Sequence, residues 1–139
     1  MPAPSPLLPR VKLVLRLVMA VAMMGVGIDH FANPEPFVRI VPAVLPAPLA
    51  LVYVSGFFEF LGGAGLLVPR VRRAAAWGLI ALYLAVFPAN VNMAIHHIPL
   101  EPGHPIPTAL LWLRLPLQAV LIAWAYWFTR PDPEAPPQR

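Results

Sequence analysis

The chain has 139 residues, of which 59% are hydrophobic and 12% are charged, and its formal net charge is +4. Soluble domains carry about 25% charged residues, so this composition excludes an ordinary soluble protein and favours a membrane protein. Cysteine is absent, which excludes a thiol relay, a haem thiolate and a cysteine-bound iron–sulfur cluster within the chain.

Four long apolar runs organise the sequence, and each is long enough for a membrane-spanning helix. The predicted helices cover about residues 11–32, 48–68, 74–95 and 107–128. Because the connections are short, the fold class predicted is all-α: an integral membrane four-helix antiparallel bundle spanning 11–128. The proline-rich ends, 1–10 and 129–139, are predicted to be disordered tails.

The segment between the first two helices, 33–47, has apolar residues at helical spacing. Pro36 and Pro42 limit any helix there to short pieces. We expect this segment to lie on the membrane surface, or to dip into it, as a lid over the mouth of the bundle.

The basic residues indicate topology rather than nucleic acid binding, because they lie at the ends of apolar runs and form no basic face. Only Arg39 falls on the outer side of the predicted membrane, and Arg114 falls within it. The positive-inside rule therefore predicts a multi-pass protein with both termini in the cytoplasm. The inner basic residues are Arg10, Lys12, Arg16, Arg70, Arg72, Arg73, Arg130 and Arg139.

A carboxylate, Glu59, lies near the middle of the second apolar run. A charge at that depth costs at least ~2.5 kcal/mol, so it should face protein or trapped water. Ser55, Gly56, Gly62 and Gly63 share its helical face, and such small residues allow close approach of a neighbouring helix. We expect Glu59 to point into a helix–helix contact, and Asp29 to pack inward beside Gly25.

Polar residues from all four helices fall in the outer half of the predicted membrane, which suggests one buried network. Its predicted members are Asp29, His30, Glu59, Tyr83, Asn90, Arg114 and Gln118. Arg114 cannot lose its proton, so it requires a carboxylate nearby. We expect Asp29 to be its first partner, with Glu59 approaching from below.

Two interpretations of this network are open. It either fixes the register of the helices, as a buried ion pair can, or it binds the polar head of an apolar ligand under a roof formed by Phe31 and residues 37–45. A quinone fits the second interpretation, because the polar donors suit its carbonyls and the apolar walls suit its tail.

The second outer loop contains four residues that can bind metals: His96, His97, Glu101 and His104. Their spacing matches no defined zinc or copper site, so no metal site is predicted. The sequence leaves open whether the loop binds a metal.

Several short motifs are spread over about residues 11–128. They are His30-Phe31 with Pro34 and Phe37, Ile40-Val41-Pro42, Leu45-Pro46, Ser55-Gly56 with Glu59, Gly65-Leu66-Leu67, Arg72-Arg73, Phe87-Pro88-Ala89-Asn90 and the pattern from Leu113 to Gln118. Together these motifs resemble the DoxX-like family of small membrane proteins, and the last two are the most specific of them.

The resemblance implies a four-helix protein of the bacterial inner membrane, serving as an accessory or quinone-binding subunit of a membrane oxidoreductase. Any redox centre would come from that partner, since the chain has no haem, flavin or thiol apparatus of its own. Two alternatives stay open: a stand-alone binder or chaperone for an apolar small molecule or membrane protein, and a membrane enzyme. The enzyme would use Glu59 or Asp29 with His30 as acid and base. Membrane lipid and a second copy of the chain are the other expected partners.

Overall fold

The structure is a computed structural model that describes residues 7–132. Its helices are α1 (Leu7–Ala32), α2 (Glu35–Ile40), α3 (Pro48–Leu67), α4 (Arg72–His96) and α5 (Thr108–Phe128). No strand is found within these residues, where Glu101 and His104 form only an isolated bridge. The all-α prediction is confirmed.

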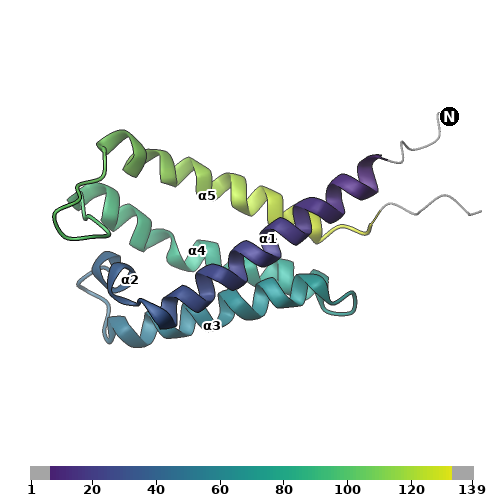
Figure 1. The fold of residues 1–139 in the computed structure, drawn as a ribbon, viewed down its shortest axis with the longest axis horizontal. Helices are drawn as coiled ribbons and strands as arrows, with labels where there is room; N and C mark the ends of the chain where they lie inside the picture. The colour runs from purple at the N-terminus through teal and green to yellow at the C-terminus, as the bar shows by residue number, and fades with distance from the viewer. Residues whose placement is uncertain (1–6, 133–139) are drawn as a thin grey trace, which may run out of the picture.

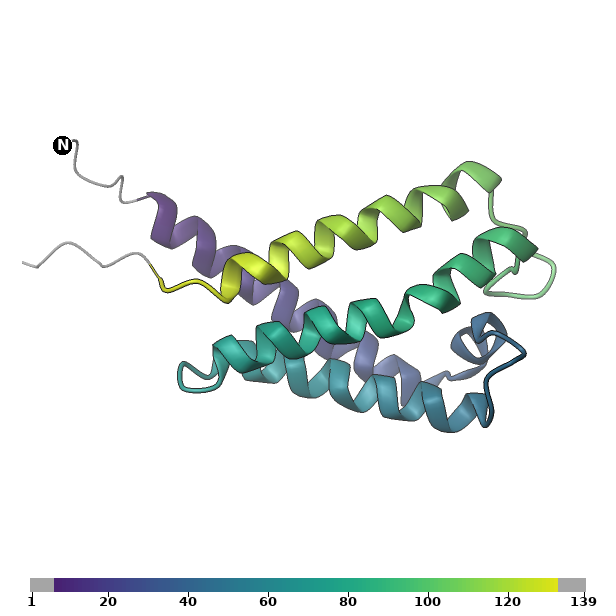
Figure 2. The same ribbon diagram turned by 180° about the vertical axis from the view of Figure 1, so that it is seen from behind.

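The four long helices alternate in direction and form the antiparallel bundle seen in Figures 1 and 2. Each is long and apolar enough to cross a membrane. The beginning of α1 and the end of α5 lie at one end of the bundle, here called the terminal end. The short helix α2 and the loop 97–107 lie at the opposite end, here called the α2 end (Figure 1).

The predicted helix boundaries agree within two residues, except at the N-terminus. Helix α1 begins at Leu7, inside the predicted tail 1–10, and Pro9 is tolerated because the first turn of a helix needs no backbone N–H. The tail predicted from residue 129 is also wrong at its start, because Thr129 bonds back to Tyr126 and Asp132 is ion-paired. The rest of both predicted tails, 1–6 and 133–139, lies outside the described residues.

The closest helix contact joins α1 to α3, and it depends on glycine. A Cβ atom at Gly27 would lie 2.7 Å from the Gly56 carbonyl oxygen, and one at Gly56 would lie 2.5 Å from the Cβ of His30. The two backbones therefore touch, as small residues allow. The predicted small-residue face of the second membrane helix is confirmed for Gly56 and Gly63, whereas Gly62 packs against Leu79 of α4. The predicted inward packing at Gly25 is wrong, since a Cβ there would meet nothing within 4 Å.

Neighbouring helices pack in the order α1, α3, α4, α5, and α1 crosses toward α5 near the terminal end (Figures 1 and 2). The buried apolar residues fall into two clusters. The α2-end cluster contains Ile40, Met93, Ala94 and Leu111. The terminal-end cluster contains Met19, Ala20, Met23, Leu66, Ala76, Leu79, Ile80, Tyr83, Ala125 and Phe128.

A layer of polar side chains separates or borders these clusters. Along α4 and α5, Asn90 and Gln118 lie between the two clusters. Along α1 and α3, His30 and Glu59 lie beyond the terminal-end cluster, toward the α2 end. We call these four residues the polar layer. The sequence predicted inward-facing polar groups on all four helices, and the structure confirms this for these four residues, which form two separate pairs.

Candidate functional site

His30 and Glu59 form a buried acid–base pair between α1 and α3. The His30 Nδ1 atom lies 3.4 Å from Glu59 Oε2, and the two side chains are only 9% and 14% exposed. The glycine contact explains this position, because Gly56 has no side chain to keep His30 away from α3. The expectation that Glu59 points into a helix–helix contact is confirmed, and so is the inward position of His30.

The hydrogen bonds of His30 define which ring nitrogen carries the proton. Its Nδ1 atom lies 2.8 Å from the carbonyl oxygen of Val26. A carbonyl oxygen only accepts hydrogen bonds, so Nδ1 must carry a hydrogen and donate it. In the neutral ring, Nε2 is then the acceptor. The ring of Phe37, from α2, stacks on the imidazole at a centroid distance of 3.8 Å.

A second polar group links α4 to α5. Asn90 Nδ2 donates to Gln118 Oε1, and Gln118 Nε2 donates to the carbonyl oxygen of Tyr83 at 2.6 Å. Pro88 has no backbone N–H, so the carbonyl of Leu84, four residues earlier in α4, lacks its helical donor. Gln118 donates to the preceding carbonyl, that of Tyr83, and not to that of Leu84. Gln118 therefore has a structural task as well as a place in the layer.

Arg114 lies at the edge of this group, and its expected ion pair is not formed. Its side chain is exposed, and its Nη2 atom is 3.5 Å from Asn90 Oδ1. Within residues 7–132, no carboxylate oxygen lies within 4.0 Å of its guanidinium. Arg114 thus keeps unused N–H donors beside the polar layer.

The two remaining predicted members differ, since Asp29 lies outside the network and Tyr83 joins it only through its backbone carbonyl, which accepts from Gln118. Asp29 is exposed on the face of α1 that turns away from α3, so its prediction as a buried partner of Arg114 is wrong. Helical geometry explains the error, because adjacent residues point about 100° apart and only His30 shares the face of Gly27 and Met23. Tyr83 is buried in the terminal-end cluster, where its hydroxyl contacts Met23 Sδ at 3.0 Å.

Helix α2 covers the His30 side of the polar layer, which agrees with the first part of the predicted lid, whereas Val44 and Leu45 are exposed. Phe37 covers His30, while Ile40 belongs to the α2-end cluster. Asn92 Nδ2 donates to the Ile40 carbonyl oxygen at 2.9 Å and fixes α2 to α4. Phe31 does not share in this roof, because it stacks on Tyr53. The sequence reasoning missed Asn92, although a second amide beside Asn90 was a usable signal.

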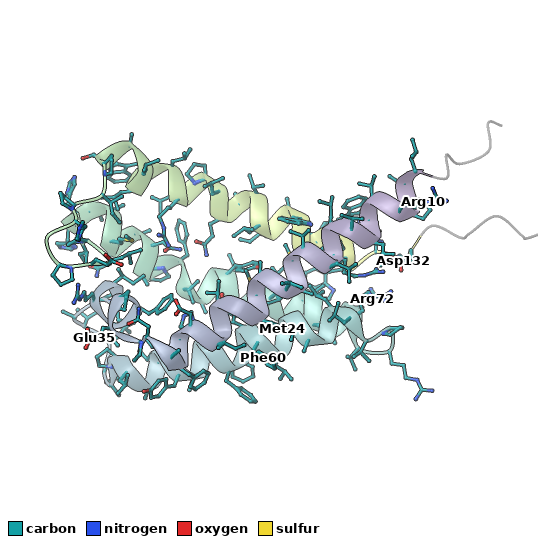
Figure 3. All side chains as sticks on the ribbon, viewed as in Figure 1. Arg10, Met24, Glu35, Phe60, Arg72 and Asp132 are labelled. Atoms are coloured by element: carbon teal, nitrogen blue, oxygen red, sulfur yellow. The ribbon has the colours of Figure 1, made fainter. Side chains whose placement is uncertain are left out.

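The terminal end carries a charged cluster that the sequence reasoning also missed. Lys12 is only 2% exposed, and its Nζ donates to the carbonyl oxygens of Arg130 and Pro131 at 2.9 and 3.0 Å. Asp132 pairs with Lys12, Arg16 and Arg72 at 2.9–3.1 Å. We call these four side chains the terminal clasp, and Figure 3 shows Arg72 and Asp132 close together there. The cluster was not predicted because Asp132 was assigned to a disordered tail.

The surroundings of Asp132 also change its acidity. Partial burial raises the pKa of this carboxyl group, but the hydrogen bonds and charges of Lys12 and Arg16 outweigh that effect. The net result is a pKa below the ordinary value of 3.8. Asp132 is therefore charged at neutral pH and neutralises part of the basic cluster around it.

The histidine-rich loop shows no gathered ligand set. His104 Nδ1 lies 3.7 Å from Glu101 Oε2, and both side chains are largely exposed. Within residues 7–132, no group of three or more His, Cys, Asp or Glu side chains is arranged to hold a metal ion.

The fold and the apolar helices together define a class: an all-helical protein with four helices fit to span a membrane. The family described as "Domain of unknown function (DUF8561)" matches residues 19–129, which is most of the chain. The protein therefore belongs to this family. No curated protein and no solved structure matches the chain.

Proposed function

We propose that this protein binds the polar head of an apolar ligand in its polar layer, and that the ligand is a quinone. The observation that carries the proposal is the buried pair of His30 and Glu59 between two helices that are long and apolar enough to span a membrane. Ionisable residues inside membrane helices are costly to keep there and usually mark functional sites. A pair needed only for packing is replaceable by apolar residues without loss of stability.

The donor set of the layer suits such a ligand. His30 Nε2 can accept a hydrogen bond from a hydroxyl, while the unused N–H groups of Arg114 can donate to a carbonyl. A bound quinone supplies two-electron, two-proton chemistry. The chain's own part is to hold and orient the head and to exchange a proton through the His30–Glu59 pair. Exposed apolar side chains beside Arg114 on α5, Leu113 and Leu117, suit the adjoining tail.

The proposed setting is the bacterial inner membrane, with both termini in the cytoplasm. Most basic residues lie at the terminal end, whereas Arg39 lies at the α2 end. This asymmetry supports the proposed orientation, because cytoplasmic loops carry an excess of Lys and Arg. The DoxX-like motifs support a role as accessory subunit of a membrane oxidoreductase. That partner would supply the redox centre, because cysteine is absent from the chain.

The test is to purify the full chain in mild detergent with native lipid and to quantify the extracted quinone per protein. The proposal predicts stoichiometric quinone in the wild type and strongly reduced quinone in Glu59→Gln and Arg114→Gln. Asp29→Asn is the matched control, because Asp29 is an exposed acid on the same bundle. Equal quinone in wild type and both variants, or none in the wild type, would contradict the proposal.

A membrane enzyme is the second candidate, and the same pair favours it, since a carboxylate beside an imidazole is suited to acid–base catalysis. Asp29 is not a candidate acid or base for this enzyme, because its side chain is exposed. Turnover of an apolar substrate that is lost in both Glu59→Gln and His30→Gln, with no bound quinone in the wild type, would select the enzyme over the quinone binder.

A further inference from the structure

A long apolar groove runs along the outside of the α3–α4 pair, away from the polar layer. It has a volume of about 790 Å³, within the range of about 300–1,000 Å³ that is typical of small-molecule sites. Its walls are almost wholly apolar, and most of its lining residues are small. The small residues are Gly62, Ala64, Gly65, Ala74, Ala75, Gly78, Ala81 and Ala85.

The groove has the length of one membrane leaflet. Along α4 it extends from Ala74 to Ala85, which at 1.5 Å per residue is about 16 Å. Half of a hydrocarbon core of about 30 Å is about 15 Å. It begins at Val68 and Val71, in the turn between the two helices, and ends near the middle of both. A lipid acyl chain anchored at the terminal end would fill it and reach no further.

Positive charge lies where the headgroup of such a lipid would be. Arg70 immediately precedes the groove residue Val71, and Arg73 immediately precedes the groove residue Ala74. Both arginines are exposed, and Arg73 also lines a smaller pocket beside Asp132. Neither has a carboxylate oxygen within 4.0 Å in the part of the chain from 7 to 132, whereas Arg72 between them is paired with Asp132. Arginine binds phosphate oxygens with paired N–H donors.

We infer that the α3–α4 groove is a binding site for an anionic phospholipid. Its acyl chain lies in the groove, and its phosphate binds Arg70 and Arg73 at the terminal end. Basic pockets beside membrane helices bind anionic headgroups in this way. The site is separate from the polar layer, so it does not depend on the proposed quinone.

The structure provides a variant that fills the groove without disturbing the fold. A Cβ atom at Gly78 would meet nothing within 4 Å, so Gly78→Leu adds a side chain to the groove and improves helix propensity. Gly25→Leu is the matched control, because Gly25 is equally open but lies on α1, outside the groove. Arg70→Gln with Arg73→Gln removes the headgroup contacts, and Arg10→Gln removes an exposed charge elsewhere at the terminal end (Figure 3).

The experiment is native mass spectrometry of the full chain in detergent, titrated with phosphatidylglycerol, phosphatidylcholine or glycerol phosphate. Phosphatidylglycerol should bind the wild type more tightly than phosphatidylcholine, and glycerol phosphate should bind far more weakly than either. Gly78→Leu should weaken phosphatidylglycerol binding at least about tenfold by filling the groove. Each arginine removed should weaken it about fivefold. Gly25→Leu and Arg10→Gln should bind as the wild type does.

Three results would overturn the inference. Undiminished phosphatidylglycerol binding by Gly78→Leu, with helix content and unfolding temperature as in the wild type, would place the lipid elsewhere. Glycerol phosphate binding as tight as the lipid would show an anion site without an acyl chain. A wild-type dimer that Gly78→Leu converts to a monomer would show that a second copy fills the groove. Quinone content is measured on the same samples, so failure of the lipid site is distinguishable from failure of the proposed function.

Discussion

The two ends of the bundle treat charge differently. At the terminal end, Asp132 meets three cations, and Lys12 is further bonded to two carbonyl oxygens. At the α2 end, Arg114 has one long contact to an amide, and the His30 ring keeps a free acceptor nitrogen. The first arrangement has little left to offer a ligand and serves to join the termini. The second retains unused donors and acceptors, which a binding site needs.

The position of the polar layer depends on the α1–α3 glycine contact, and breaking that contact should have the largest effect. Gly56→Leu would place atoms within 2.5 Å of His30 Cβ, and we expect a loss of about 3 kcal/mol in the free energy of unfolding. Denaturant unfolding in detergent, followed by circular dichroism, measures it. Gly25→Leu should lie within about 0.5 kcal/mol of the wild type. Equal stability of the two variants would contradict the close contact.

The terminal clasp should contribute to stability through its buried cation. Lys12→Met keeps the apolar stem but removes the charged donor to the Arg130 and Pro131 carbonyls. We expect a loss of about 2 kcal/mol, as is typical of hydrogen bonds to charged groups. Arg10→Met, at an exposed position on the same helix, is the control and should be close to neutral. An equal loss in the free energy of unfolding of Lys12→Met and Arg10→Met would mean that the overall charge of the helix end, and not the terminal clasp, determines stability.

The clasp should also make stability depend on pH in a defined direction. Because the folded pKa of Asp132 is below its ordinary value of 3.8, its contribution is present above that value and is lost as the pH falls through the folded-state value. The unfolding temperature of the wild type should therefore exceed that of Asp132→Asn near neutral pH, and the gap should close in acid. A difference in unfolding temperature that widens in acid would contradict a lowered folded-state pKa for Asp132.

The smallest effect on stability is expected at the α2 end. Arg114 is exposed and lacks a carboxylate partner within the described chain, so Arg114→Gln should change the free energy of unfolding by no more than about 0.5 kcal/mol. Ligand content should nevertheless fall. A variant that loses stability and ligand together would indicate that Arg114 has a structural role like that of Lys12.

Much of the fold was predictable, because helix length and apolar composition are local properties of the sequence. The four spans, their antiparallel order, the lid and the inward position of Glu59 all follow from such patterns. The residues that pair with each charged side chain could not be predicted in this way, because the pairing depends on how the helices are rotated and on contacts between distant parts of the chain. Asp29 and His30 are adjacent, yet only His30 is buried. The terminal clasp joins residues 12 and 132, and no local sequence pattern predicts that contact.

The proposed ligand would occupy the polar layer between α2 and the terminal-end cluster. The most direct measurement is a density map of the full chain crystallised from native lipid. We predict non-protein density within hydrogen-bond distance of His30 Nε2 and of the Arg114 guanidinium. Protein side chains that fill this space, with Arg114 turned toward lipid and nothing bound beside His30, would contradict it.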